Sequence, residues 1–156
     1  MAQENDIKHI IREIQYRYAP DRRIEVFQIE IHQKGDTSIV KGVTTSKDAY
    51  DELIRILKEK YPAFIDSIRL LPDVQLGEYT EGIVYNSVGT IRHAPRYNSE
   101  MITQTLLGVK VKILEENNGW RRVQTPDKYI GWMNGSLKPL SKAEILSYNN
   151  QPKVIV

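Results

Sequence analysis

The sequence of 156 residues contains no cysteine. This absence excludes disulfide bonds, cysteine-ligated metal sites and a thiol nucleophile within the chain. It does not identify a compartment, because many exported proteins also lack disulfides. A reaction that depends on a cysteine would therefore have to be carried out elsewhere than in this chain.

The sequence also lacks long hydrophobic runs and an intact signal peptide. No apolar stretch approaches the roughly 20 residues of a membrane-spanning helix. The N-terminal sequence MAQENDIKHI has neither the basic region nor the apolar core of a signal peptide. We expect Ala2 to begin the mature part of an exported protein, with Met1 added for expression, although a cytoplasmic protein would look the same.

Neither sign of charge predominates. The chain has 22 Lys and Arg against 20 Asp and Glu, a net charge of +2, which gives no general case for a nucleic-acid partner. Residues 77–156 hold 10 basic and 7 acidic residues, whereas residues 1–76 hold 12 and 13. This mild excess in the second half would suit an anionic polymer, but a solvated surface has the same composition.

Patterns typical of catalytic and metal sites are missing too. The three histidines are His9, His32 and His93, and they fall in a helical pattern, at a strand end and in a loop. There is no HExxH motif and no glycine-rich phosphate loop. No base lies near Ser87 in the sequence. We therefore predict no catalytic residue, no metal ligand and no cofactor.

Residues 5–73 have the pattern helix-strand-strand-helix-strand. Asn5 or Asp6 can cap a helix that continues to Tyr18, where Ala19-Pro20 ends it. One face of this helix is apolar at the spacing i, i+3, i+4, i+7. The residues of that face are Ile7, Ile10, Ile11, Ile14 and Tyr18.

Two strands, a second helix and a third strand follow. Residues 23–32 and 38–44 alternate apolar and polar side chains around a turn and predict a hairpin with one apolar face. Ser46 can cap the second helix, which Tyr61-Pro62 ends. A third strand is predicted from Phe64 to Leu71.

This first part resembles a BON-like domain, a small α+β module of bacterial envelope proteins. The resemblance rests on Val40-Lys41-Gly42-Val43, on the helix after Ser46 and on Ile65 to Leu70. A generic fold of two helices and three strands with no specific relation remains an alternative. Residues 74–80 are polar and aperiodic, contain Gly77, and are predicted to be a linker.

Residues 82–140 consist of short apolar alternations separated by turn residues. Val109, Val111 and Ile113 alternate with neighbours on the other face, and further strands are expected at 120–123 and 129–133. Short strands at this spacing predict a small antiparallel barrel or sandwich. The predicted fold class of the whole chain is thus α+β, with an all-β second part.

The motifs that end these strands resemble the bacterial SH3 (SH3b) pattern over residues 81–140. At one position the chain departs from it, because Lys128 stands where many members have glycine in the last hairpin. The matching motifs are Ile91-Arg92 with Pro95, Leu107-Gly108, Gly119-Trp120 with Val123, and Tyr129-Ile130-Gly131-Trp132.

Residues 141–156 are predicted to form a short helix and the start of a further segment. Ser141 and Glu144 have the spacing of a capping box. The apolar end, Lys153 to Val156, resembles the first strand of another domain.

A small α+β domain followed by an SH3b domain resembles the front part of NlpC-type cell-wall cysteine peptidases. The resemblance implies a location in the cell envelope or periplasm and a downstream cysteine peptidase domain that cleaves γ-D-glutamyl-diamino-acid bonds in peptidoglycan. This chain would then be the non-catalytic region that targets the enzyme or positions stem peptides. The alternative is a stand-alone protein-interaction module of the envelope.

The SH3b resemblance places a ligand groove beside the loop from Arg92 to Met101. Aromatic rings suit such a groove because they offer contact area at little entropic cost. Arginine and asparagine side chains can bind carboxylates and amides. Trp132 is expected in the core. For Trp120, a place in the core and a place in the groove both remain open. The predicted ligand-binding residues are Arg92, Arg96, Tyr97, Asn98, Trp120 and Tyr129.

Overall fold

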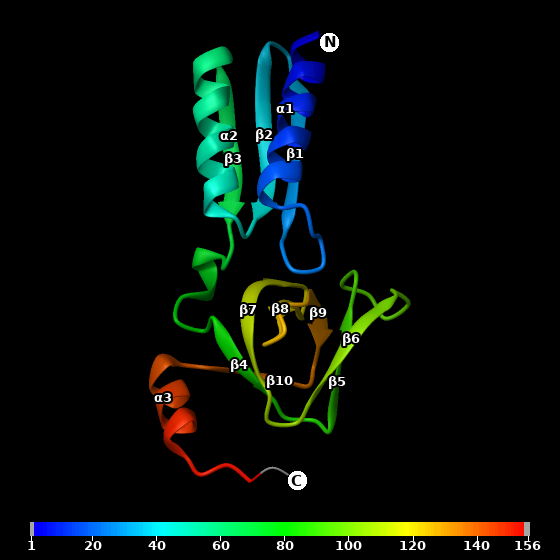
Figure 1. Cartoon of the computed structure of the whole chain (residues 1–156), viewed down its shortest axis with the longest axis vertical. Coiled ribbons are helices and arrows are strands. Elements are labelled where there is room, and N and C mark those ends of the chain that lie inside the picture. Colours follow the sequence, from blue (N-terminus) through cyan, green and yellow to red (C-terminus); the bar gives the residue numbers. More distant parts are fainter. Residues whose placement is uncertain (1, 155–156) are drawn as a thin grey trace. The chain divides into compact units, whose positions relative to one another are not determined.

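The computed structural model describes residues 2–154, which form two compact units, Met1–Leu71 and Pro72–Val156 (Figure 1). Each unit has its own hydrophobic core. The chain as a whole is α+β, with three α-helices and ten strands in two sheets among the described residues.

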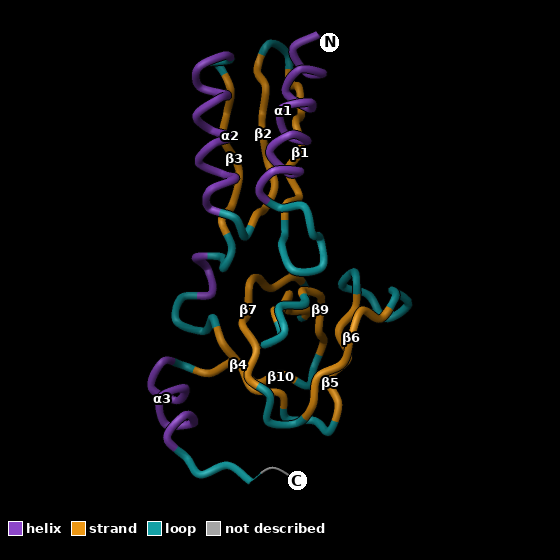
Figure 2. Tube along the Cα trace, in the orientation of Figure 1, coloured by secondary structure: helices purple, strands orange, loops and turns teal. Residues whose placement is uncertain are grey.

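The first unit has the predicted order helix, strand, strand, helix, strand (Figure 2). Its elements are α1 (Ala2–Tyr18), β1 (Phe27–Lys34), β2 (Thr37–Thr44), α2 (Lys47–Lys60) and β3 (Phe64–Leu70).

The ends of α2 are those that the sequence predicts. The Ser46 hydroxyl accepts a hydrogen bond from the Ala49 amide at 3.2 Å, which satisfies one of the free amides of the first turn. At the other end, the Tyr61 amide donates to the Leu57 carbonyl at 2.7 Å. Both predicted boundaries are confirmed.

Strand β1 begins later than predicted, at Phe27, because the preceding residues form a turn. The amides of Ile24 and Glu25 donate to the Asp21 carbonyl at 3.2 and 3.1 Å. The Arg23 guanidinium donates to the Asp21 carboxylate at 2.8 Å and lowers the pKa of that carboxyl to about 2. A local side-chain contact thus replaces the first residues of the expected strand.

The sheet of this unit has the order β1-β2-β3. Strands β1 and β2 form an antiparallel hairpin, with Ile31 opposite Val40 and Ile29 opposite Gly42. Strand β3 is parallel to β2, so α2 is the crossover between them. A side chain at Gly42 is excluded, because its Cβ would lie 1.9 Å from a backbone oxygen of β1.

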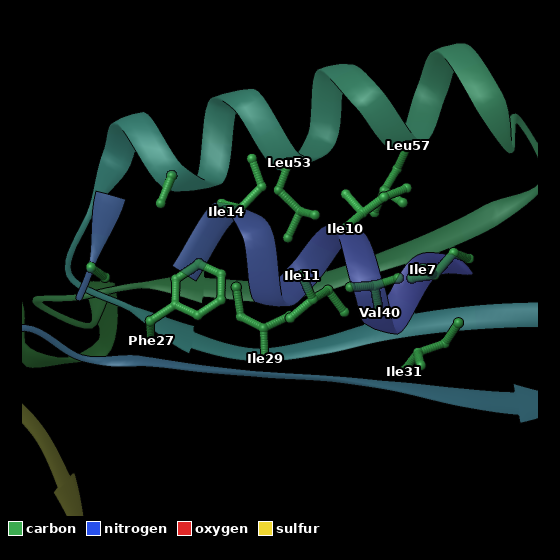
Figure 3. Close-up of a cluster of buried hydrophobic side chains, with 12 residues drawn as sticks. Ile7, Ile10, Ile11, Ile14, Phe27, Ile29, Ile31, Val40, Leu53 and Leu57 are labelled. Atoms are coloured by element: carbon green, nitrogen blue, oxygen red, sulfur yellow. The ribbon is translucent and has the colours of Figure 1, made fainter. Parts of the chain in front are cut away.

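Both helices cover one face of this sheet. Helix α1 packs on β1, and α2 packs on β2 and β3. Figure 3 shows the isoleucines of α1 in the layer between the leucines of α2 and the strands. The core residues are Ile7, Ile10, Ile11, Ile14, Ala19, Phe27, Ile29, Ile31, Val40, Ala49, Leu53 and Leu57. The apolar stripe that the sequence predicts for the first helix is therefore its buried face.

The second unit is mainly β, and its seven strands form one sheet in the order β10-β4-β7-β8-β9-β5-β6. Figure 1 shows these strands curled into a ring. The elements are a short 3-10 turn (Val74–Leu76), β4 (Glu81–Val84), β5 (Val88–Arg92), β6 (Met101–Leu106), β7 (Lys110–Asn117), β8 (Trp120–Gln124), β9 (Ile130–Asn134), β10 (Leu137–Leu140) and α3 (Lys142–Asn150).

Strand β5 pairs with β9 at Arg92, which lies opposite Trp132. At Gly131 a Cβ would lie 2.5 Å from the Ile91 side chain, so this close approach requires glycine. The core inside the curl consists of Val84, Ile91, Val111, Ile113, Val123, Met133 and Leu137.

The segment predicted as a linker, residues 74–80, is bonded to the second unit at both of its ends. The Asp73 amide donates to the Leu114 carbonyl at 2.7 Å, and the Ile113 amide donates to the Thr80 carbonyl at 2.8 Å. Leu114 is the extra residue of a bulge in β7, opposite β8. This segment is therefore not a free linker. The first unit ends at Leu71, and the second begins at Pro72.

The predicted capping box at the last helix is confirmed. The Glu144 amide donates to the Ser141 hydroxyl at 3.3 Å, and the Ser141 amide donates to the Glu144 carboxylate at 2.8 Å. The Tyr148 hydroxyl donates to the Gly108 carbonyl and ties α3 to the unit. The predicted terminal strand is not seen in residues 151–154, and its last two residues lie outside the described part.

Candidate functional site

The loop between β5 and β6, residues 93–100, is closed at its base by three hydrogen bonds. The Arg92 guanidinium donates to the Ser99 carbonyl at 2.8 Å, and the Ala94 amide donates to the buried Ser99 hydroxyl at 2.9 Å. The His93 amide donates to the Glu100 carbonyl at 2.9 Å. The base of the loop is thus fixed, while its tip is presented to solvent.

The tip carries the most exposed aromatic side chain of the second unit. Tyr97 is 71% exposed, yet its hydroxyl donates to Oδ1 of Asn134 at 3.1 Å. Its ring meets Trp120 edge to face, with the centroids 5.0 Å apart and the planes at 61°. Trp120 and Asn134 are themselves paired across β8 and β9. We call Tyr97, Trp120 and Asn134 the Tyr97 cluster.

Trp120 supports the Tyr97 ring and offers little contact surface of its own. It is 7% exposed, and the Tyr97 ring lies against it. The sequence leaves two alternatives for Trp120, a place in the core or a place in the groove. In the structure its side chain is buried. Tyr97 therefore has a fixed neighbour on one side and solvent on the other.

A buried ion pair lies on the same face of the sheet, next to the cluster. Arg122 is opposite Trp132 across β8 and β9, two residues along from the Trp120–Asn134 pair. The Arg122 guanidinium lies 4.6 Å from the Trp132 ring centroid and 3.0 Å from the Glu115 carboxylate. Trp132 is buried, as the sequence predicts.

The predicted arginine and asparagine ligand-binding residues divide into two groups. Arg96 and Asn98 are exposed and flank Tyr97 in the loop, so both can reach a ligand that contacts the ring. Arg92 is half-buried and uses its guanidinium to hold the Ser99 carbonyl. Its place is at the base of the loop, where it positions the tip.

The structure does not bring Tyr129 to this cluster. Tyr129 follows the turn between β8 and β9, where its carbonyl accepts a hydrogen bond from the Thr125 amide at 3.0 Å. Trp120 begins β8, and Gln124 ends it opposite Ile130. At about 3.3 Å per residue, the four steps along β8 from Trp120 to Gln124 span roughly 13 Å, and Tyr129 lies one position beyond them.

Sequence reasoning missed Asn134 and the Glu115–Arg122 pair. The register of the β8–β9 hairpin would have placed Asn134 opposite Trp120, and the hairpin pattern was available in the sequence. The register of β7 and β8 could not have been read, because the bulge at Leu114 moves Glu115 into position opposite Arg122.

No metal-binding group stands out in the part of the chain that the structure describes. Within residues 2–154, no three His, Asp or Glu side chains lie together in a way that could hold a metal ion. No described helix is long and apolar enough to cross a membrane. The features of this region are those of a contact surface: one oriented ring, nearby polar groups and a rigid base.

Comparison with known proteins bears on the same region. Residues 91–136 match the family model of the bacterial dipeptidyl-peptidase SH3 domain. The matched range includes the whole loop and all three residues of the Tyr97 cluster. No curated protein matches the chain. The match supports a bacterial SH3 domain in the second unit and suggests a binding or targeting module.

Proposed function

We propose that this chain is the non-catalytic region of a bacterial peptidoglycan endopeptidase, which holds stem peptides at the Tyr97 cluster. The observation that carries the proposal is the state of Tyr97, which is 71% exposed but held by Asn134 and Trp120. An exposed ring that is already oriented loses little entropy when a ligand packs on it.

The neighbours of Tyr97 match the chemistry of a stem peptide. Such a peptide offers carboxylates, amides and small apolar side chains. The Arg96 guanidinium can bind a carboxylate through two parallel hydrogen bonds, and the Asn98 amide can pair with a peptide group. The free face of Tyr97 gives flat apolar contact between them.

The family match supports a connection with peptidases, because its description names a bacterial dipeptidyl-peptidase. The chain has no cysteine, so a thiol nucleophile would belong to a downstream NlpC-type domain. In this proposal the protein is exported to the cell envelope. The first unit is a BON-like domain, a reading supported by its order of helices and strands.

The alternative is a stand-alone envelope module that binds another protein. The Tyr97 cluster would serve this role as well, since aromatic side chains are also enriched at protein interfaces. The two functions differ in their ligand: a stem peptide suffices for the first, whereas the second requires a folded partner.

A titration of the full chain with a purified muropeptide, followed by amide NMR, tests the proposal. We expect shifts in residues 93–100 and around Trp120, with a dissociation constant of roughly 0.1–1 mM because little surface is buried. Tyr97→Ala should weaken binding at least about fivefold, the loss expected for one aromatic contact.

Tyr85→Ala is the matched control, because Tyr85 is also exposed in the second unit but lies between β4 and β5. It should leave the affinity unchanged. Equal losses for the two variants, or shifts confined to residues 2–71, would contradict a stem-peptide site at the Tyr97 cluster. Absence of any shift with the muropeptide would favour the protein-interaction module.

A further inference from the structure

Strand β1 forms an open edge of the first unit. The sheet order begins with β1, and no strand among residues 2–154 lies beyond it. Strand β1 has eight residues, no proline and no bulge in its pairing with β2. Natural sheets usually block such an edge, because every second residue directs its backbone N–H and C=O outward.

A hollow of about 460 Å³ follows this edge beneath α1. Its floor is apolar and includes Ile11 of α1 with Ile29 and Ile31 of β1. Its rim is formed by Lys8, Arg12 and Gln15, which recur at i, i+4 and i+7 along one side of α1. Glu30 of β1 also lines the hollow.

The charge of the hollow is positive on the helix side. Lys8 pairs with Glu4 at 2.5 Å and remains half-exposed, whereas Arg12 forms no ion pair with any residue in 2–154. Glu30 belongs to the opposite face of the sheet by strand alternation, and its carboxylate lies 3.3 Å from His32. Acidic side chains entering beneath α1 would therefore meet Lys8 and Arg12.

The position of α1 limits which strands can pair with the open edge of β1. A second copy that paired its own β1 here would carry its own α1 above that strand. Paired strands lie about 4.8 Å apart, whereas packed helices need 8–10 Å between their axes. Because α1 packs directly on β1, the two helices would overlap. A single extended segment without a helical layer avoids this clash.

We propose that β1 and α1 form a docking site for an extended acidic peptide segment of another protein, which adds to the sheet as a fourth strand. Backbone hydrogen bonds to β1 supply the pairing, as in other cases of strand addition. Alternate side chains turn toward the outer flank of α1, where their methylene groups contact the small exposed part of the isoleucines and their carboxylates reach Lys8 and Arg12. The site belongs to the first unit and does not depend on the function of the Tyr97 cluster.

The test uses the full chain and a blocked octapeptide of alternating glutamate and threonine. We expect amide NMR shifts in residues 8–15 and 27–34. The double variant Lys8→Glu/Arg12→Glu should bind this peptide about tenfold more weakly, since two charge contacts are reversed. The matched control Lys58→Glu alters an exposed lysine of α2 outside the hollow and should change the affinity less than about twofold.

Two N-methylated forms of the peptide separate strand addition from simple charge attraction. One is methylated at the glutamates and the other at the threonines, so each lacks alternate N–H groups. Only one set of N–H groups can face β1, and we expect only that form to lose binding. Equal binding of both forms, or shifts centred on the lysines of the second unit, would overturn the proposal. So would a dimer in sedimentation velocity that the peptide does not dissociate.

Discussion

The Trp132 ring is 5% exposed and has the Arg122 guanidinium over one face. Replacing Trp132 by alanine removes a large buried side chain and leaves Arg122 without its aromatic contact. We expect Trp132→Ala to lower the free energy of unfolding by about 3–5 kcal/mol. Urea unfolding followed by Trp120 fluorescence measures the change. Tyr97→Ala, which removes an exposed ring, should cost less than about 1 kcal/mol by the same measurement.

Lys128 has a positive φ of 73° in the turn between β8 and β9. The Lys128 amide donates to the Thr125 carbonyl at 2.9 Å, and Asp127 does not have a positive φ. The turn is therefore a type I turn, with Pro126 at its second position, followed by a left-handed residue. A lysine in this conformation is strained, because its Cβ crowds the following carbonyl.

Lys128→Gly should therefore stabilise the second unit by about 0.5–1 kcal/mol. The midpoint of urea unfolding gives the measurement. Lys138→Gly provides a matched control in β10, where glycine should destabilise. An unchanged or lowered midpoint for Lys128→Gly would show that the lysine side chain contributes more than the strain costs.

Among the elements, α3 depends on its capping box and on one buried residue, Ile145. Hydrogen bonds from Ser141 lower the pKa of Glu144 below its ordinary value of 4.5. Because the folded-state pKa is the lower one, the stabilising contribution of this carboxylate is complete above pH 4.5 and is lost as the pH falls through the lowered value.

We expect the protection of the α3 amides, measured relative to the intrinsic exchange rate at each pH, to fall at low pH before that of the strands of the second unit falls. Glu144→Gln should remove most of this pH dependence, and Ser141→Ala should weaken the helix by about 1 kcal/mol at all pH values. Protection factors from NMR exchange rates provide the test, over about three pH units that span the carboxyl range. Equal pH dependence in the wild type and Glu144→Gln would contradict the role of the cap.

Short-range signals predicted the starts of two of the three helices. The cap expected at Asn5 or Asp6 was wrong, because α1 already begins at Ala2. Ser46 and Ser141 begin their helices as predicted, because a cap depends on residues three positions apart. The start of β1 was misjudged, because Asp21 and Arg23 form a turn that competes with the strand. The last strand was expected from apolar composition alone, a signal that does not distinguish a strand from an unpaired segment.

The candidate site was only partly predictable. Tyr97, Arg96 and Asn98 were predicted to present contacts from the loop, and all three side chains are exposed there. The partner that orients Tyr97 was not, because Asn134 lies on another strand and its distance from the loop depends on register. Tyr129 was assigned to the same groove because it is aromatic, although the length of β8 separates it from Trp120.

For the whole molecule, the two separate cores suggest a direct test of independence. Both tryptophans lie in the second unit, so tryptophan fluorescence reports on that unit alone. Most of the helical signal in circular dichroism comes from α1 and α2 of the first unit. Leu53 is fully buried in the first core.

We expect Leu53→Ala to lower the midpoint of the helical transition, with a loss of about 2–5 kcal/mol, and to leave the fluorescence transition in place. Val123→Ala, a substitution in the second core, should have the opposite pattern. If both probes moved together in either variant, the two units would unfold as one cooperative structure and not as separate domains.

The parallel pairing of β2 with β3 has a consequence for the order of events during folding. The β1–β2 hairpin closes over residues 35–36, whereas residues 45–63 separate β2 from β3. Closing the longer loop costs more chain entropy, so the hairpin can form early while the third strand must wait for α2. A nascent chain that has not yet released β3 from the ribosome therefore exposes β2 as a second open edge, and this interval is when wrong strand partners can compete.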